Sequence, residues 1–555
     1  MTQTGARILA DVIEKQEALD SVFFVDAVLR HTLLELEDRG IARILAHSEK
    51  AAAYMADGYA RATGKLGVCM AQAVGAANLA AGLQDGYLDR VRMLAMTGRK
   101  PDSHQHRNAY QEVPHGPLYG PVTKFTGEVR DVNELPRMLG HALRAGRTGT
   151  PRPVHLDLDG LKGDMVEEVP FTGDPALLGF PASGQSAPAL PDRAMLDQAA
   201  ALLAGAARPM LVCGVSSLYD KAGPGVMALA ERLGLPVATS VGGRSVIPTS
   251  HPNHFGVVGT YSAPYANALL AQSDLVIYVG CHMGDQISTN WTIPTPGTKI
   301  IQIDTDPAEL GRGYPNVLGL AGDLNRTLLA LAETYVETPG NGWLARCISA
   351  AREWLASSLG EFDGQEDLIP APLLAHELGK ALPENGIVVA DTGFSATWTA
   401  QYTAFDKPGQ TYLRAAGSLG WAFPAALGAQ QGAKNRPVVC FTGDGAFYYH
   451  IGELETMRRW NIPAVIVVNN NSALGQGLRS VKKLYERRDG NLGDLVEFQK
   501  TNFADLAQVF GIRSFRVERA ADIRPTLEKA IALREPVVVD VVTDPDSNPE
   551  PAWSL

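Results

Sequence analysis

The sequence lacks paired cysteines. Its 555 residues contain five cysteines, and none of them forms a Cys-x-x-Cys pair. Four of the five lie in apolar, strand-like runs, which predicts buried free thiols and fits a reducing cytosol. The five are Cys69, Cys213, Cys281, Cys347 and Cys440. A secreted domain held together by disulfides is therefore not expected.

Excess positive charge and long hydrophobic runs are also missing. The chain has 49 Lys and Arg against 60 Asp and Glu, a formal net charge of −11, which argues against nucleic acid or an anionic membrane as the main partner. Polar residues interrupt the longest apolar stretches, such as 71–83, so no membrane span is predicted. Residues 1–19 are charged and predict an amphipathic helix rather than a signal peptide. We expect a cytoplasmic protein.

The chain is long enough for several domains. Hydrophobic residues make up 45% and charged residues 20% of it, as in globular proteins with ample core. Residues 171–192, rich in Pro, Gly, Ala and Ser, predict a linker, and a second boundary is expected near 361–372. Each block alternates Val/Ile-rich runs with helical patterns, which predicts α/β folding. We expect three doubly wound parallel-sheet domains, at residues 1–170, 192–340 and 365–545.

Two polar turns in the last domain carry the clearest chemical signal. Gly443-Asp444-Gly445-Ala446 and Asn469-Asn470-Asn471 each follow an apolar strand-like run, and residues 447–460 between them predict a helix. In open α/β sheets ligands bind at the carboxyl ends of strands, where glycines let backbone amides approach an anion. A carboxylate and an amide oxygen are the hard ligands that Mg²⁺ prefers. The turns therefore predict a metal-diphosphate site.

These turns resemble those of the thiamine diphosphate enzymes, in which Gly-Asp-Gly is followed, after a helix and a strand, by Asn-Asn. Matching the Leu474-Gly475 step makes Asn470-Asn471 the family pair and leaves Asn469 on the strand. The resemblance implies Mg²⁺ bound by Asp444, the Asn471 side chain and the Ala473 carbonyl. The cofactor-binding residues that it implies here are Gly443, Asp444, Gly445, Ala446, Asn471, Ala473, Leu474 and Gly475.

A segment near the amino end resembles the glutamate helix of the same family. It runs from Ala46 to Ala62, and Glu49 falls at the family's glutamate, while His47 and Ser48 replace the usual Arg and His. The resemblance implies that Glu49 faces the aminopyrimidine ring and favours its imino tautomer, whose nitrogen removes the thiazolium C2 proton. Glu49 is therefore the first catalytic candidate.

Three further segments fit the same cofactor. Residues 415–426 resemble the loop that holds the pyrimidine, with the Gly417 carbonyl and the Leu419 amide at the ring and the Leu419 side chain wedged between the two rings. Residues 388–396 predict a strand and glycine turn that add donors to the diphosphate. Residues 73–78 and 110–112 resemble loops beside the reaction centre, where Gln111 points at the substrate. The additional cofactor-binding candidates are Asn78, Thr392, Gly393, Phe394, Ser395, Gly417, Ser418 and Leu419.

The order of the blocks resembles the acetolactate synthase, decarboxylase and lyase group: pyrimidine-binding domain, central domain, diphosphate-binding domain. In this group the active site lies across a subunit interface, which implies at least a homodimer and commonly a homotetramer. Some relatives hold FAD or ADP in the central domain. Here the turn after Cys213 lacks Gly-x-Gly-x-x-Gly and residues 280–285 contain no Arg, so bound FAD or ADP is not favoured.

The resemblance implies an enzyme that makes or breaks a carbon–carbon bond next to a carbonyl of a small molecule. The leading form is 2-oxo acid decarboxylation and/or carboligation, acetolactate synthase-like, although Ser480 stands where those synthases carry a Trp. The alternatives are a lyase acting on a 2-hydroxyacyl-CoA or hydroxyketone, and an FAD-containing oxidase of the same fold. Asp26 either projects into the active site or caps the next helix. Further substrate-facing candidates are Tyr110 and Gln476.

Overall fold

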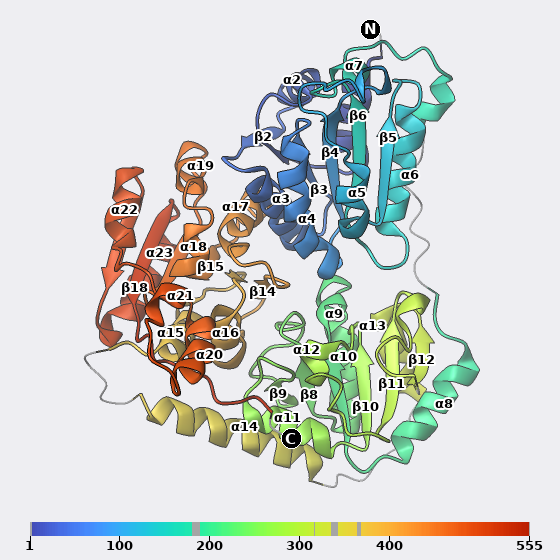
Figure 1. The fold of residues 1–555 in the computed structure, drawn as a ribbon. Coiled ribbons are helices and arrows are strands. Elements are labelled where there is room, and N and C mark those ends of the chain that lie inside the picture. The colour runs from blue at the N-terminus through green and yellow to red at the C-terminus, as the bar shows by residue number, and fades with distance from the viewer. Residues whose placement is uncertain (1–2, 180–188, 316, 335–341, 363–367, 554–555) are drawn as a thin grey trace.

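Three six-stranded sheets form the computed structural model, which describes residues 3–179, 189–315, 317–334, 342–362 and 368–553 (Figure 1). For Gln16 and Pro175 only the backbone is described. All strand pairs within the three sheets are parallel, and each sheet falls inside one predicted block, so the α/β class with three parallel sheets is confirmed. Residues 180–188 of the predicted linker, and 335–341 and 363–367 near the second boundary, lie outside the described residues.

The first sheet has the order β2-β1-β3-β4-β6-β5. Its central strands are buried on both faces because helices cover them, which explains their continuous apolar runs. The strands are β1 Ser21–Phe24, β2 Ala42–Leu45, β3 Gly67–Ala71, β4 Met93–Arg99, β5 Phe125–Val129 and β6 Val154–Asp159. The helices are α1 Gly5–Asp11, which continues as a π-helical turn Val12–Gln16, α2 Arg30–Asp38, α3 Glu49–Thr63, α4 Gly75–Leu88, α5 Gly116–Tyr119, α6 Leu135–Arg147 and α7 Asp164–Glu167.

The central sheet has the order β12-β11-β10-β7-β8-β9. Its strands are β7 Pro209–Cys213, β8 Val237–Thr239, β9 His254–Val257, β10 Leu275–Val279, β11 Lys299–Asp304 and β12 Val317–Ala321. Its helices are α8 Arg193–Ala204, α9 Val215–Tyr219, α10 Gly223–Leu233, α11 Pro264–Gln272, α12 Asp285–Ser288 and α13 Leu324–Thr334. The long helix α14, Trp343–Gly360, leads to the third domain along the lower edge of Figure 1.

The third sheet has the order β14-β13-β15-β16-β18-β17. Its strands are β13 Ile387–Ala390, β14 Thr411–Arg414, β15 Val438–Gly443, β16 Val465–Asn470, β17 Arg513–Val517 and β18 Val537–Val542. Its helices are α15 Ala371–Ala381, α16 Phe394–Tyr402, α17 Ala422–Gly432, α18 Asp444–Tyr448, α19 Glu453–Arg459, α20 Gly475–Tyr485, α21 Gly493–Val496, α22 Phe503–Val509 and α23 Ile523–Leu533. β13, β15 and β16 are neighbours, so the turns that follow them share one edge of the sheet.

The helix predicted over residues 447–460 is interrupted. Residues 449–452 separate α18 from α19. The break turns the buried Glu453 toward the first domain, where its carboxylate accepts the backbone N–H of His47 at 3.0 Å. Lys50 lies over the Tyr449 ring at 5.3 Å. Contacts with residues about 400 positions earlier therefore override the local helical pattern.

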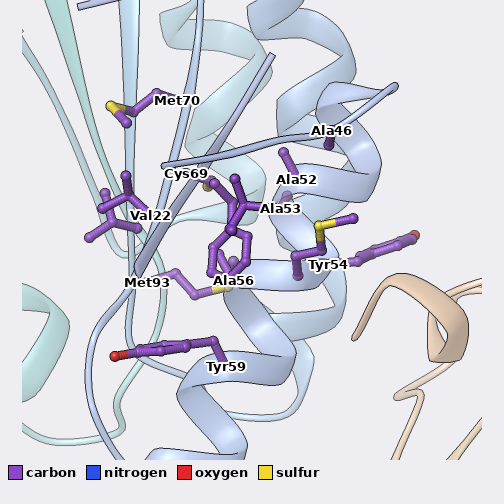
Figure 2. Packing of buried hydrophobic residues seen from close by; sticks show 14 of the residues in the cluster. Val22, Ala46, Ala52, Ala53, Tyr54, Ala56, Tyr59, Cys69, Met70 and Met93 are labelled. Carbon is purple, nitrogen blue, oxygen red and sulfur yellow. The ribbon is translucent and has the colours of Figure 1, made fainter. Parts of the chain in front are cut away.

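The first and third domains share one hydrophobic core, because α3 packs directly against α17 (Figure 1). A Cβ added at Gly58 would lie 1.9 Å from the Ala425 carbonyl oxygen, and one added at Gly428 would lie 1.8 Å from that of Met55. The two backbones are thus in contact, and neither position has room for a methyl group. Figure 2 shows the opposite face of α3, where Ala52, Ala53 and Ala56 pack beside Val22 and Cys69.

A buried ion cluster joins all three domains. The Arg61 guanidinium of α3 contacts the carboxylates of Asp57, Asp85 and Asp89 at 2.7, 2.9 and 2.7 Å. It also donates to the Arg414 carbonyl at 2.7 Å, in the third domain. Tyr219 of the central domain donates to Asp89 at 3.0 Å. Burial alone would lower the pKa of Arg61, but the neighbouring carboxylates, chiefly Asp57, outweigh it and raise that pKa well above its usual range.

All five cysteines are buried and unpaired, which confirms the prediction of free thiols. Across the part of the chain that the structure describes, helices are too short or too polar to cross a membrane.

We predict that Arg61→Met strongly destabilises the protein, because it leaves three buried carboxylates without their counter-charge. Breaking a buried ion pair costs about 3–5 kcal/mol. The urea midpoint and the thermal midpoint should both fall. The matched control is Arg193→Met, since the Arg193 side chain is 74% exposed in its ion pair with Asp197, and such surface pairs contribute about 0–1 kcal/mol. Equal midpoints for the two variants would contradict the role of Arg61.

Candidate functional site

The predicted metal-diphosphate residues meet at the carboxyl ends of β13, β15 and β16. Helices α16 and α20 begin there, and neither has a side chain capping its first turn. Their free backbone N–H groups and helix dipoles favour an anion. Gly393, at φ +65° and ψ −140°, adopts a conformation open essentially to glycine alone, and it aims the start of α16 at this edge.

The three turns touch one another. A Cβ added at Gly445 would lie 2.7 Å from Leu474 Cδ2, and one added at Gly475 would lie 3.2 Å from both Asn471 Nδ2 and Phe394 Cδ2. A Cβ added at Gly393 would lie 3.2 Å from the Gln476 amide oxygen. The predicted residues 392–395, 443–446 and 471–476 therefore form one cluster, in which glycines keep the backbones close together.

The carboxylate of Asp444 has an unsatisfied oxygen at the centre of this cluster. The residue is 2% exposed, and its Oδ1 accepts the Gly445 N–H at 2.7 Å. Its Oδ2 is buried and has no hydrogen-bond partner among the described residues. Burial raises the pKa of Asp444 to about 7, although the backbone amides of Gly445, Ser472 and Ala473 act in the opposite direction. A cation beside Oδ2 would remove this penalty, so the residues fit a bound metal ion.

The asparagine register agrees with this site. Asn470 donates to the Thr501 carbonyl and to Asp540, both at 2.9 Å, and Asn469 Oδ1 accepts the Thr543 hydroxyl at 2.7 Å. Asn471 lies past the end of β16, and its Oδ1 accepts the Ala473 N–H at 3.1 Å. The side chains of Asn469 and Asn470 thus form hydrogen bonds within the third domain, and Asn471 is the asparagine at the predicted metal site. Clusters of three or more His, Cys, Asp or Glu suited to a metal are absent from the described residues. The predicted ligand set would not form such a cluster, because it contains one carboxylate.

Two buried carboxylates hold the loop predicted to bind the pyrimidine. Asp85 of α4 accepts the backbone amides of Ala416, Gly417 and Ser418 at 2.8, 3.3 and 3.0 Å. Asp391, at the end of β13, accepts those of Gly420 at 3.1 Å and Ala422 at 2.9 Å. Burial raises the pKa of Asp391 to about 6. The Leu419 amide is not among those that the two carboxylates bind, and Gly417 is exposed.

The roles of Asp85, Asp391 and the Arg61 cluster were not predicted from the sequence. A signal was present, because Asp57 and Arg61 lie four residues apart in a helix that is otherwise nearly all Ala, Gly and other apolar residues. Asp85 likewise lies in the apolar helix α4. Charged residues in helices that are apolar on every side point to buried partners.

The predicted residues of the first domain form a second cluster. Glu49 is the first residue of α3, and its Oε2 accepts the Asn78 side-chain N–H at 2.7 Å. A Cβ added at Gly75 would lie 2.5 Å from Glu49 Oε1. Gln111 Oε1 lies 3.5 Å from the Val74 backbone nitrogen. Glu49 and Gln111 therefore both contact the segment 73–78, which carries Asn78.

Among the remaining candidates, Asp26 and Tyr110 lie on the surface. Tyr110 is 73% exposed. Asp26 is exposed at φ +61° and accepts only the N–H of the adjacent Ala27. The interpretation of Asp26 as a helix cap is wrong, because α2 begins at Arg30 and its first amides bond to the Glu167 carboxylate.

The chain matches three family models that together cover most of its length. They are described as thiamine pyrophosphate enzyme, N-terminal TPP binding domain, at residues 3–117, central domain, at residues 196–331, and C-terminal TPP binding domain, at residues 391–541.

Curated relatives match along nearly the whole chain. A probable acetolactate synthase large subunit of Methanocaldococcus jannaschii is 31% identical over 92% of this chain and 87% of its own length. The acetolactate synthase large subunit of Corynebacterium glutamicum is 31% identical over 99% and 88%. The acetolactate synthase isozyme 2 large subunit of Escherichia coli is 30% identical over 94% and 91%.

We predict that Asp444→Ala loses affinity for thiamine diphosphate in the presence of Mg²⁺. Removing an outer-shell partner of a metal already weakens its binding about 10–100-fold, and loss of a direct ligand should exceed that. Isothermal titration calorimetry at fixed Mg²⁺ measures the affinity. The control is Asp489→Ala, an exposed aspartate of the same domain. Undiminished affinity in the Asp444 variant would refute the assignment.

Proposed function

The chain belongs to the thiamine pyrophosphate enzyme family, and on that basis we propose that Asp444, Asn471 and Glu49 operate its cofactor. It is a thiamine diphosphate-dependent enzyme that makes or breaks a carbon–carbon bond next to a carbonyl. The observation that carries the residue assignment is the unpartnered Asp444 oxygen enclosed by three contacting turns. The proposed leading activity is decarboxylation of a 2-oxo acid, with or without ligation to a second carbonyl.

The third domain supplies the anchor. Asp444, the Asn471 side chain and the Ala473 carbonyl would bind Mg²⁺, and the amides that begin α16 and α20 would bind the diphosphate. Bound thiamine diphosphate would supply a nucleophilic carbon that attacks the substrate carbonyl. Hydrogen bonds from the loop 416–422 to Asp85 and Asp391 fix its backbone. Gly417 and Leu419 would therefore meet the pyrimidine with a backbone that is already in place.

The first domain supplies the proton chemistry. The Asn78 N–H occupies one oxygen of the Glu49 carboxylate, which leaves the other to exchange a proton with the aminopyrimidine. Asn78 also fixes the direction of that carboxylate. Gln111 contacts the same turn at the Val74 backbone nitrogen, and its amide can stabilise charge that develops on the substrate.

The substrate remains part of the proposal. The named relatives are acetolactate synthase subunits, which favours a 2-oxo acid. Ser480, where those synthases carry a Trp, lies exposed on α20 and removes a large contact for a second substrate. A lyase acting on a 2-hydroxyacyl-CoA or hydroxyketone is therefore the second candidate. A screen of 2-oxo acids and 2-hydroxyacyl-CoA thioesters with thiamine diphosphate and Mg²⁺ distinguishes the two.

A flavin oxidase is less well supported. Arg90 of the first domain, 3% exposed, reaches over the carboxyl ends of the central strands and contacts Ser216 at 2.9 Å and Asp304 at 3.1 Å. Ser216 lies in the first turn of α9, where a dinucleotide phosphate would bind. The neighbouring cavity measures about 360 Å³, near the lower limit for ligand pockets of about 300–1,000 Å³. Arg90 is already paired with the buried carboxylates of Asp304 and Glu309, both at 3.1 Å, which leaves it unavailable to a phosphate and argues against FAD.

Assembly and compartment complete the proposal. The Glu49 cluster and the Asp444 cluster belong to different domains, and the hydrogen bond from Asn78 keeps Glu49 within the first. We propose that two chains form at least a homodimer in which each cofactor lies between Glu49 of one subunit and Asp444 of the other, and that dimers pair into tetramers. The five buried free thiols support a reducing, cytosolic environment.

We predict that Glu49→Gln slows cofactor activation. The amide keeps the shape of the side chain but cannot support proton exchange at the pyrimidine, a contribution of about 10²–10⁴-fold. The rate at which the C2 proton of bound thiamine diphosphate exchanges with deuterium, followed by NMR after rapid quench, measures the effect. Glu37→Gln is the control, since the Glu37 side chain is 56% exposed in the same domain. An unchanged exchange rate in the Glu49 variant would contradict the proposed role of Glu49 in cofactor activation.

A mixing experiment tests the shared site. Glu49→Gln and Asp444→Ala chains should each be inactive, whereas a mixed dimer contains one site with both changes and one with neither. If subunits reassort freely, half of the dimers are mixed and turnover should recover to about one quarter of the wild-type value. No recovery, with subunit exchange verified by native mass spectrometry, would mean that each chain completes its own site.

A further inference from the structure

Two side chains of the short segment 115–119 form hydrogen bonds with the turn 73–78, which carries Gly75 and Asn78. His115 precedes α5, and its Nε2 lies 2.9 Å from the Ala73 carbonyl oxygen. Tyr119, four residues further on, donates its hydroxyl to the Ala76 carbonyl at 2.8 Å. His115 is 3% and Tyr119 0% exposed, so both bonds are shielded from water. The carbonyls of Ala73 and Ala76 are thus bound by the residue that precedes α5 and by the last residue of α5.

A buried polar network supports this segment. His115 Nδ1 lies 3.0 Å from both oxygens of Asp157, on β6. Both ring nitrogens of His115 therefore lie within hydrogen-bond distance of an oxygen, Nδ1 of the Asp157 carboxylate and Nε2 of the Ala73 carbonyl. Thr97 donates to Asp157 at 2.7 Å. The ring of His155, whose pKa burial lowers to about 3, stacks on Tyr119 at 3.5 Å. The network fixes the direction of both side chains that reach the turn.

The same turn contacts the two side chains assigned to the chemistry. Asn78 donates to Glu49, and Gly75 lies against the other Glu49 oxygen. The Val74 amide faces Gln111, which is on the segment that leads to His115. The distance between the turn and this segment therefore sets how Glu49 and Gln111 stand relative to each other.

We propose that His115 and Tyr119 are positioning residues that clamp the turn 73–78, so that Asn78 and Gly75 hold the Glu49 carboxylate in one orientation and Gln111 at a fixed distance from it. The two residues lie beneath the site and touch neither cofactor nor substrate. This inference rests on the proposed function insofar as Glu49 and Gln111 act there, whereas the clamp itself is a property of the first domain.

Amide hydrogen exchange tests the clamp without reference to activity. Tyr119→Phe removes only the hydroxyl and should fold, and His115→Phe keeps a ring but removes both ring nitrogens. His141→Phe, at an exposed histidine of the same domain, is the matched control. Peptides spanning residues 73–80 should exchange faster in the first two variants and at the wild-type rate in the control. Unchanged exchange in Tyr119→Phe and His115→Phe would overturn the clamp.

Kinetics of the holoenzyme test the positioning role. Misplacement of a catalytic group by about 1 Å can cost about 100-fold in rate, so His115→Phe should lower kcat and C2 proton exchange on that scale, with affinity for thiamine diphosphate little changed. His115→Gln, which keeps one N–H donor, should recover part of the rate. Faster amide exchange with unchanged kcat would overturn the positioning role. Absence of C2 exchange in the wild-type protein would instead contradict the proposed function, and the amide exchange would still decide the clamp.

Discussion

The ion cluster around Arg61 is the interaction on which the placement of the loop 416–418, proposed to bind the pyrimidine, depends. Asp85 can hold the amides of Ala416, Gly417 and Ser418 as a buried carboxylate only because Arg61 balances its charge. The same guanidinium binds Asp89, which receives the Tyr219 hydroxyl from the central domain. Burial raises the pKa of Asp57 to about 6, while Arg61 and the Trp421 N–H, which donates to Asp57 at 2.8 Å, favour its charged form. One cation thus fixes the loop to all three domains.

Helix α3 combines three tasks along its length. Its first residue is Glu49, its middle packs backbone to backbone on α17 through Gly58, and its last turns carry Asp57 and Arg61. The spacing of these residues is set by the helix itself, since each residue rises about 1.5 Å. Glu49, which is proposed to activate the cofactor, and the Asp57–Arg61 ion pair, which supports the loop 416–418, are therefore carried by one rigid helix.

Much of this architecture was predictable because its signals are local. Apolar runs predicted the strands of each sheet, and the glycine turns around Asp444 and Gly393 predicted a ligand-binding site at one edge of the third sheet. The break at residues 449–452 was not predictable, since it depends on His47 and Lys50, which precede it by about 400 residues. The partnership of Asp85 with the loop 416–418 spans 331 residues between Asp85 and Ala416 and leaves no periodic trace. Asp26 was misread because a lone Asp before a helix resembles a cap, whereas Glu167 reaches the helix from a distant turn.

The close contacts of Gly58 with Ala425 and of Gly428 with Met55 limit how the protein can move. Domains that slide past one another need a layer of side chains whose rotamers can readjust, and α3 and α17 have no such layer where their backbones touch. The first and third domains therefore behave as a single rigid block, and hinge bending between them is blocked as well by their continuous core. Any movement that accompanies entry of substrate is therefore expected in surface segments and not between these two domains.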